Sequence, residues 1–161
     1  MPKPMLILLK IKQHDDEIFK KPTQPLIDYD FTTELIDLGN NMVHTMRYHK
    51  FVGLAANQVG IRRKIIIVQN EVYPYVVINP EIVSHSVETD IEFEGCGSVL
   101  DLIVPVRRYK EVLIEGKTPS GLIYRQSHKG YIARIFQHEI DHLNNVFISD
   151  RTSELVQETR S

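Results

Sequence analysis

The segment RIFQHEIDHLNN at residues 134–145 places His138 and His142 four residues apart, with Glu139 directly after the first. Four residues are close to one helical turn, so both imidazoles fall on one face of a helix. Two histidines beside a buried face are costly unless a partner satisfies them, and a divalent metal ion would do so. Glu139 would then project to the side where a bound water could sit. The spacing therefore predicts a metal site with a carboxylate base.

The ligands beyond these two must come from elsewhere in the chain. One class of metalloprotease has a third histidine six residues after the second, but residues 143–148 read LNNVFI, without a glycine or a histidine. Other metalloproteases take a glutamate from a later helix. Here only Glu154 and Glu158 remain, with little chain to support a second packed helix. A third ligand is therefore expected upstream; without one, the histidines belong to an ordinary solvated helix.

The upstream candidate is Cys96, the single cysteine of the chain, in the segment EGCGS at residues 94–98. A lone cysteine is more often a small buried hydrophobe than a ligand. A thiolate nevertheless binds zinc and ferrous iron strongly, and flanking glycines let the backbone come close to the ion. With His138 and His142, Cys96 would form a Cys-His-His site with one open position.

These residues need elements that hold them together. Apolar residues at helical spacing predict helices at residues 33–49 and 131–145. Apolar, β-branched runs predict strands at residues 5–11, 64–69, 75–80, 82–87, 111–116 and 121–126, the last two joined as a hairpin. Strands outnumber helices and do not alternate with them. The sequence therefore predicts an α+β fold, with mainly antiparallel sheets packed around the His-Glu-x-x-His helix.

The composition indicates one domain spanning residues 1–161, with 42% hydrophobic and 25% charged residues. A formal net charge of -2, with scattered lysines and arginines, gives no basic surface for nucleic acid or for an anionic membrane. The early apolar run MLILL at residues 5–9 is too short for a membrane helix or a signal peptide. One cysteine allows no internal disulfide, which fits a reducing compartment. We expect a cytoplasmic monomer.

Three motifs stand in order along the chain: FVGLAANQ at residues 51–58, EGCGS at 94–98 and QHEIDH at 137–142. They are similar to the Gly-x-Gly-Leu-Ala-x-x-Gln, Glu-Gly-Cys-Leu-Ser and Gln-His-Glu-x-Asp-His motifs of peptide deformylases. The chain therefore resembles that family. The resemblance covers most of the chain, including INPEI at 78–82 and HLNNVFISDR at 142–151.

The chain departs from the family pattern at three positions. Phe51 replaces the first glycine of the first motif, Gly97 replaces the leucine of the second, and Leu100 stands where a proline is usual. Only 19 residues follow His142, so the C-terminal helix that many bacterial members extend is expected to be short or absent.

The resemblance implies one divalent metal ion on Cys96, His138 and His142, with Fe(II) favoured over Zn(II). Hydrolysis of a formamide requires a nucleophilic water, a proton carrier and stabilisation of the oxyanion. Glu139 would accept a proton from the metal-activated water and deliver it to the leaving amine.

The oxyanion would be stabilised by the side-chain amide of Gln58 and the backbone N–H of Gly97. Because that second donor is backbone, glycine preserves it, although it also loosens the loop and removes a side chain from the wall beside the substrate. Asp141 points off the metal-facing arc and is expected to support a ligand. Arg108 is a candidate partner for Asp141 or Glu94, with an exposed arginine as the alternative.

An extended formylated peptide would pair with backbone groups beside the first motif and place its methionine side chain in an apolar pocket. The residues expected to bind it are Val52, Gly53, Leu54, Gly95, Tyr131, Arg134 through its methylenes, and Ile135. The other histidines lack metal-ligand spacing and are expected at the surface or at caps: His14, His44, His49, His85 and His128.

The resemblance therefore implies a metal-dependent hydrolase that removes the formyl group from the N-terminal formylmethionine of nascent polypeptides, with the ribosome as its expected place of action. A protein that keeps the fold and the metal but binds peptide or a partner with little turnover is the alternative, motivated by Phe51, Gly97 and Leu100. A metallopeptidase comes third.

Overall fold

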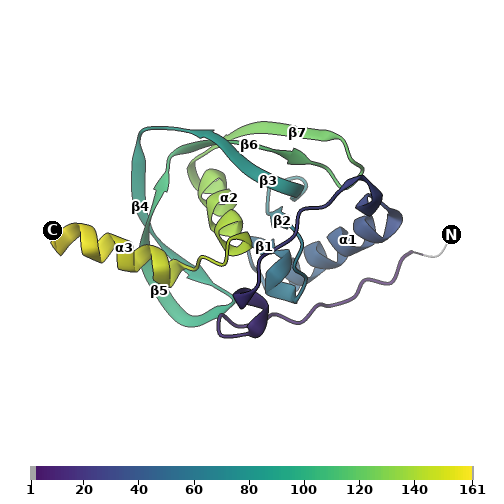
Figure 1. Cartoon of the computed structure of the whole chain (residues 1–161), viewed down its shortest axis with the longest axis horizontal. Helices are drawn as coiled ribbons and strands as arrows, with labels where there is room; N and C mark the ends of the chain where they lie inside the picture. The colour runs from purple at the N-terminus through teal and green to yellow at the C-terminus, as the bar shows by residue number, and fades with distance from the viewer. Residues whose placement is uncertain (1–2, 161) are drawn as a thin grey trace.

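The computed structural model describes residues 3–160, so the ends of the expected domain, residues 1, 2 and 161, lie outside the described residues. Figure 1 shows a central helix, α2 (Gly130–Leu143), between a larger sheet and a two-stranded hairpin. All the pairings are antiparallel between named strands, as expected from the sequence. The larger sheet has the order β1-β2-β3-β6-β7: β1 (Gly53–Ala55), β2 (Ile65–Val68), β3 (Tyr75–His85), β6 (Glu111–Lys117) and β7 (Ile123–Lys129).

Strand β2 is apolar at every position because helices cover both of its faces. Ile66 and Val68 pack in one core cluster with residues of α2, whereas Ile65 and Ile67 pack in a second cluster with residues of α1 (Thr33–Tyr48). All four side chains have 0% exposure. A strand buried on both faces reads as a continuous apolar run rather than an alternating one.

Helix α2 follows β7 directly, and Gly130 at the junction has a φ of +66°, a conformation that L side chains rarely adopt. Its apolar face, including Ala133, Phe136 and Leu143, belongs to the first core cluster. The face that carries the histidines is thereby turned toward the second sheet.

The second sheet is a hairpin of β4 (Thr89–Cys96) and β5 (Val99–Tyr109), which the sequence did not predict. Charged residues and Pro105 interrupt its apolar pattern. Its turn consists of Gly97 and Ser98 alone, since Cys96 pairs with Val99. The hairpin brings Cys96, the last residue of β4, close to α2.

The C-terminal helix, expected to be short or absent, is present as the 13-residue helix α3 (Ile148–Arg160). It packs against β5 and extends away from the body of the molecule. Arg151 on this helix is paired with Asp141 of α2, and Glu158 lies 3.3 Å from Arg107 of β5. These ion pairs supplement the small apolar face of the helix.

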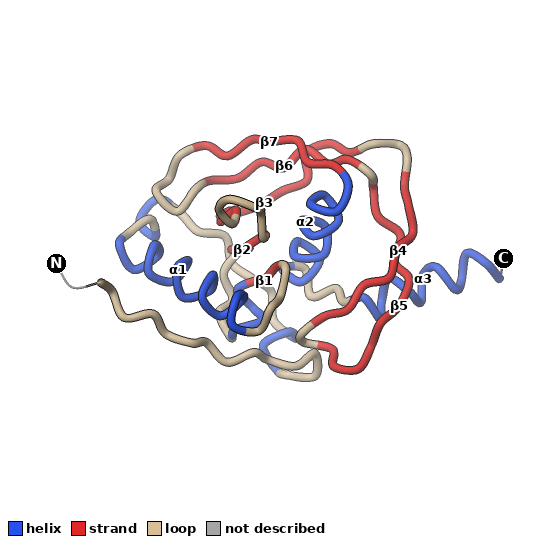
Figure 2. Tube along the Cα trace, turned by 180° about the vertical axis from the view of Figure 1, so that it is seen from behind, coloured by secondary structure: helices blue, strands red, loops and turns tan. Residues whose placement is uncertain are grey.

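The predicted strand at residues 5–11 is wrong, because no residue of this segment joins a sheet. It runs as an extended segment along α1 (Figure 2). Two of its backbone N–H groups donate to side chains of that helix and not to a strand. The N–H groups of Ile7 and Leu9 donate to Asn41 Oδ1 and Thr45 Oγ1, each at 2.9 Å.

The strands predicted at 75–80 and 82–87 are one strand, β3, with irregular register on either side of Ile82. The hairpin predicted at residues 111–116 and 121–126 is confirmed as β6–β7. Short 3₁₀ turns complete the described chain: η1 (Glu17–Lys20), η2 (Asp28–Asp30) and η3 (Ala56–Val59). Over residues 3–160, no helix has both the length and the apolar character needed to cross a membrane.

Candidate active site

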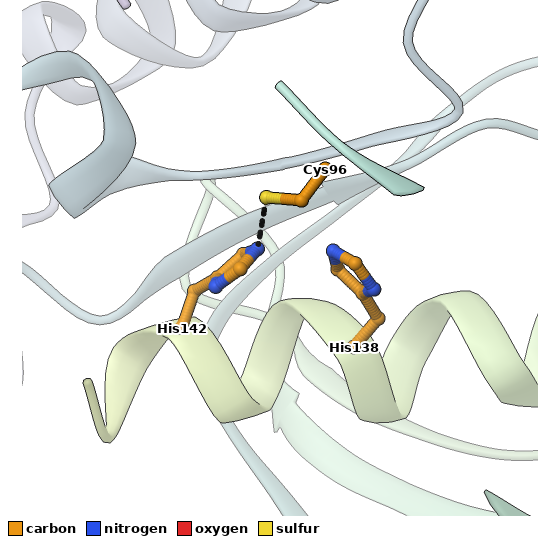
Figure 3. A group of neighbouring side chains, drawn as sticks. All are labelled: Cys96, His138 and His142. Atoms are coloured by element: carbon orange, nitrogen blue, oxygen red, sulfur yellow. Dashed lines mark hydrogen bonds between the residues drawn. The ribbon is translucent and has the colours of Figure 1, made fainter. Parts of the chain in front are cut away.

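Cys96, His138 and His142 meet in one cluster, as the sequence predicts (Figure 3). The two imidazoles project from the same face of α2 toward the thiol at the end of β4. Cys96 Sγ lies 3.3 Å from His142 Nε2, and the three potential ligand atoms all lie within 4.8 Å of one another. The imidazole planes are perpendicular, with centroids 4.6 Å apart.

This donor set fits a metal ion of borderline softness. One sulfur and two imidazole nitrogens are ligands that both zinc and ferrous iron accept. The backbone N–H of Ser98 donates a hydrogen bond to Cys96 Sγ at 3.4 Å. In residues 3–160 no second group of three such donors is found.

Glu94 anchors this cluster through four hydrogen bonds. Its two oxygens accept from Arg108 Nε at 3.0 Å and Nη2 at 2.9 Å, from Arg134 Nη1 at 2.7 Å and from His138 Nδ1 at 2.8 Å. Burial alone would raise the pKa of Glu94, but the bonds from His138 and Arg108 hold the pKa well below its usual range. The carboxylate thereby fixes the ring of His138 with Nε2 free to face the thiol.

The two imidazoles have opposite preferences for a proton. Burial would lower the pKa of His138, but its bonds with Cys96 and Glu94 outweigh burial and raise the pKa to about 10. Burial and the nearby charge of His138 lower the pKa of His142 well below its ordinary value. Two neighbouring charged imidazoles are therefore excluded, whereas two neutral ones around a cation are compatible with the geometry.

Asp141 supports the helix from its other flank. It accepts from Arg108 Nη1 at 2.5 Å, from Arg151 Nη2 at 2.6 Å and from Arg151 Nε at 2.9 Å. Arg108 thus pairs with both of the carboxylates that the sequence left as alternatives, and at 5% exposure it is not a surface arginine. Asp141 contributes no ligand atom to the cluster.

Glu139 is buried at 3% exposure, and its Oε2 has no hydrogen-bond partner among the described residues. Burial raises the pKa of this carboxyl to about 7. Gly53 of β1 lies against it: a β-carbon at position 53 would come within 2.5 Å of Glu139 Oε1. The buried Oε2 lies beside three potential metal ligands and has no partner among the described residues, so it is available to bind a proton of a reacting group.

Gln58 reaches the cluster from η3. Its Oε1 accepts from the N–H of Ala55 at 2.9 Å, which aims Nε2 at Ser98 Oγ, 3.1 Å away, and leaves it 3.8 Å from Cys96 Sγ. Gly97 follows the cysteine in the two-residue turn. The two groups expected to stabilise an oxyanion therefore flank Cys96.

Nothing in the sequence pointed to the N-terminal segment that holds these two groups. The N–H of Lys12 donates to Gln58 O at 2.7 Å, and the N–H of His14 donates to Ser98 O at 2.7 Å. Gln13 Nε2 donates to Gly97 O at 3.1 Å across a separation of 84 residues. We call residues 12–14 the strap.

Asn57, next to Gln58, is a second residue that sequence reasoning missed. Its Nδ2 donates to the backbone oxygen of His142 at 2.5 Å and so ties η3 to the end of α2. Because Asn57 lies inside the first motif, residues 51–58, the motif could have identified it.

A cavity of about 690 Å³ opens above the cluster. Gln58, Cys96, Gly97, His138 and Glu139 line it, as do six of the seven residues expected to bind substrate: Val52, Gly53, Gly95, Tyr131, Arg134 and Ile135. Leu54 is the exception, because its side chain lies in the second core cluster. Phe51 and Leu100 also line the cavity.

The remaining histidines stand apart from the cluster, and His14, His49 and His85 are exposed as expected. His128 is a correction, because its side chain has 6% exposure. Its ring stacks on Phe136 with centroids 4.4 Å apart, and Nε2 lies 2.6 Å from the hydroxyl of Tyr124. Position 128 points inward because of its place in β7, which its local sequence did not reveal.

Comparisons with known proteins agree with this geometry. The profile of the family described as "Polypeptide deformylase" matches residues 8–158. A peptide deformylase of Thermotoga maritima is 36% identical over 146 residues, which cover 91% of this chain and 88% of that protein. One from Dictyoglomus thermophilum is 36% identical over 148 residues, covering 92% and 95% of the two chains.

Solved structures show the same likeness. The crystal structure of peptide deformylase from Thermotoga maritima superposes with a TM-score of 0.86 at 35% identity, covering 90% of this chain and 97% of that one. A class I type b peptide deformylase from Acinetobacter baumannii, solved with Met-Ala-Ser bound, gives a TM-score of 0.88 at 32% identity, covering 91% and 99%.

Proposed function

Because the chain belongs to the peptide deformylase family of metal-dependent hydrolases, we propose that it hydrolyses the formyl group from the formylmethionine of nascent polypeptides. The observation that carries this proposal is the buried, unpartnered oxygen of Glu139 beside Cys96, His138 and His142, at the floor of an open cavity. The reaction adds water to the formyl carbon and releases formate and a free amine.

The metal ion would be held by Cys96, His138 and His142, and we propose ferrous iron, with zinc as the alternative. When bound, it supplies Lewis-acid chemistry that makes water a better nucleophile and polarises the formyl group. The mixed sulfur and nitrogen donors support either ion. Glu94 and Asp141 hold the ligand-bearing helix in position through their arginines.

Glu139 would transfer the proton. A pKa near 7 allows a carboxyl group to accept a proton and to give it back at neutral pH. It would take the proton from the attacking water and deliver it to the amine nitrogen as the carbon–nitrogen bond breaks. The close approach of Gly53 fixes the carboxyl group on one side and leaves Oε2 for this exchange.

Gln58 Nε2 and the backbone N–H of Gly97 would donate to the oxyanion. Donors held in place before the reaction stabilise a developing charge without reorganisation, and removing one donor from such a site costs about 10²–10³ in rate. The bond from Ala55 to Gln58 Oε1 provides that fixed orientation. The strap holds the backbone oxygens of both Gln58 and Gly97.

The peptide would lie along β1, whose one partner in the sheet is β2. The backbone of Val52, Gly53 and Leu54 would pair with an extended substrate, as in strand addition. Gly95, Tyr131, Arg134 and Ile135 line the same cavity and would surround the methionine side chain. The Met-Ala-Ser tripeptide in the Acinetobacter baumannii structure supports a peptide of this kind.

We further propose that the chain is one catalytic domain that works as a cytoplasmic monomer on chains emerging from the ribosome. Sedimentation equilibrium should give a mass near 18.7 kDa. A concentration-dependent rise to twice that mass would contradict the monomer.

The decisive experiment measures formate release from formyl-Met-Ala-Ser by protein purified without oxygen. Turnover is expected, with the activity decaying in air as ferrous iron oxidises and with a slower rate after replacement by zinc. Equal rates for the two metal forms would overturn the preference for iron. Peptide binding without release of formate would favour the alternative, a protein that keeps the fold and the metal but has little turnover. Internal cleavage of an unformylated peptide would identify a metallopeptidase.

A further inference from the structure

Two of the positions where the sequence departs from the family pattern are neighbours in space. Phe51 lies between α1 and β1, and Gly97 lies in the turn between β4 and β5. The aromatic residue stands where the pattern has a glycine, and the glycine stands where the pattern has a leucine. Large and small residues are thus exchanged between the two motifs.

The ring of Phe51 fills the space that a side chain at position 97 would need. A β-carbon built on Gly97 would lie 2.6 Å from Cε2 and 2.8 Å from Cε1 of the ring, and closer still to Cζ. Real β-carbons essentially never approach heavy atoms this closely. A larger residue at 97 therefore requires the ring to leave.

Several contacts hold the ring in that place. The N–H of Phe51 donates to the oxygen of Met46 at 2.9 Å, which fastens the residue to the end of α1. The imidazole of His49 stacks on the ring, with centroids 5.1 Å apart and an interplanar angle of 17°. The half-buried side chain also packs against the second core cluster. Moving the ring away would break the stacking and part of the packing.

We infer that Phe51 and Gly97 form an interlocked pair, in which the ring of Phe51 supplies the cavity wall beside the reacting group and limits the size of the peptide side chains that fit. This inference rests on the proposed function. Both residues line the cavity, together with the exposed side chains of Phe93, Leu100 and Ile103. Phe51 is the aromatic side chain that touches the turn carrying a proposed oxyanion donor.

A size limit of this kind follows from packing physics. An apolar wall distinguishes substrates by steric fit, and even one methylene group too many or too few changes kcat/KM by about tenfold or more. The ring of Phe51 is backed by the ring of His49, so a bulky peptide side chain would have to displace both rings. The peptide residues affected would be those that pair with the start of β1, because Phe51 lies two residues before Gly53.

The test compares four proteins: the wild type, Phe51→Gly, Gly97→Leu and the double variant that exchanges the two residues. Each is assayed with formyl-Met-Ala-Ser and with two peptides that carry a bulky residue, formyl-Phe-Ala-Ser and formyl-Met-Trp-Ser. In Phe51→Gly, kcat/KM for at least one bulky peptide relative to the small one should rise about tenfold. The double variant should return that ratio to within about threefold of the wild type.

The second readout is thermal unfolding of the metal-loaded proteins. Gly97→Leu should lower Tm when Phe51 is present, because the new side chain meets the ring, and should lower it little in the Phe51→Gly background. The matched control pairs Gly97→Leu with Tyr73→Gly, which removes an exposed ring outside the cavity. That control should not rescue Tm, since a rescue there would reflect a general effect of losing an aromatic residue.

The inference is overturned if either the peptide-selection result or the Tm result fails. If Gly97→Leu has the wild-type Tm and peptide selection, the ring moves aside freely; if Phe51→Gly keeps the wild-type ratio of kcat/KM for bulky and small peptides, the ring is not the wall. A wild type that releases no formate refutes the proposed function instead. In that case the inference is tested by two other measurements. One is whether the effect of Gly97→Leu on Tm depends on Phe51, and the other is the calorimetric affinity of the four proteins for Met-Ala-Ser and Met-Trp-Ser.

Discussion

Single residues in the QHEIDH motif have sharply different surroundings although they are adjacent in sequence. Glu139 and Asp141 are both buried carboxylates, but one has an oxygen without a partner and the other receives three hydrogen bonds from two arginines. Spacing alone places them on opposite flanks of the histidines. The structure adds the reason for the division: Gly53 approaches one flank, and Arg108 and Arg151 approach the other.

Glu139→Gln should retain the metal and lose about 10²–10⁴-fold in deformylation rate, the usual contribution of a positioned proton carrier. Asp141→Asn, the matched control, should mainly lower thermal stability, because it weakens two ion pairs. The measurement is the deformylation rate per bound metal ion in both variants. If the deformylation rate of Glu139→Gln lies within a few-fold of the wild-type rate, Glu139 is not the residue that transfers the proton.

Cys96→Ala should abolish stoichiometric metal binding and leave the fold mostly intact. The thiol supplies one of three potential ligand atoms, while its side chain adds little to the core as a partly buried neighbour of a small cluster. Elemental analysis measures the metal, and circular dichroism measures the fold. Full metal occupancy in this variant would rule out the Cys-His-His ligand set.

Elements of the fold differ in how much their own sequence reveals. Helix α2, helix α1, strand β2 and the β6–β7 hairpin were predictable, because their apolar residues follow the period of the element. The β4–β5 hairpin was not, since charged residues and a proline break its alternation, and its stability comes from α2 and α3. The segment at 5–11 has the composition of a strand, but the groups that satisfy its backbone lie on α1.

The candidate site divides in the same way. His138, Glu139, His142 and Cys96 followed from residue type and spacing, whereas Gln58 and Gly97 were predicted from the motifs that the chain shares with the family. The strap was out of reach because its contacts join residues more than 40 positions apart. The fit between Phe51 and Gly97 needed the structure as well, since sequence shows two departures and no contact.

The strap is an element whose role can be tested through Gln13. Gln13→Leu removes the hydrogen bond to Gly97 O, so the turn that carries a proposed oxyanion donor should be held less precisely. We expect kcat to fall about tenfold, the loss that corresponds to about 1.4 kcal/mol of transition-state stabilisation, with metal content and Tm nearly unchanged.

Gln157→Leu, an exposed glutamine on α3, is the control and should keep the wild-type kcat. A Gln13→Leu enzyme with unchanged kcat and a raised KM would place the strap in peptide binding rather than in the positioning of the turn.

At the scale of the whole molecule, the cluster around His128 makes stability depend on pH. Burial lowers the pKa of this ring, which faces Tyr75, Tyr124 and Phe136. Its neutral form therefore favours the folded state, and the unfolded chain binds more protons below the unfolded pKa of about 6.5. This contribution is complete above that pH and is lost as the pH falls toward the lower pKa of the folded state.

His128→Gln should therefore flatten the decline in the free energy of unfolding between pH 7 and pH 5. Urea titrations at several pH values measure it, with the exposed His85→Gln as the control. Because both variants share every other titrating group, the difference in slope isolates the buried ring. Identical slopes for the two variants would show that His128 is not the source of the pH dependence.

The double burial of strand β2 has a consequence for how the protein is made. Ile65 and Ile67 meet their partners on α1 soon after synthesis, but Ile66 and Val68 pack with residues of α2, which leaves the ribosome more than sixty residues later. Domains fold as units while the chain emerges from its N-terminus. The helix that closes this core also carries His138, Glu139 and His142. We therefore expect completion of the core to coincide with assembly of the candidate metal ligands, after α2 has been translated.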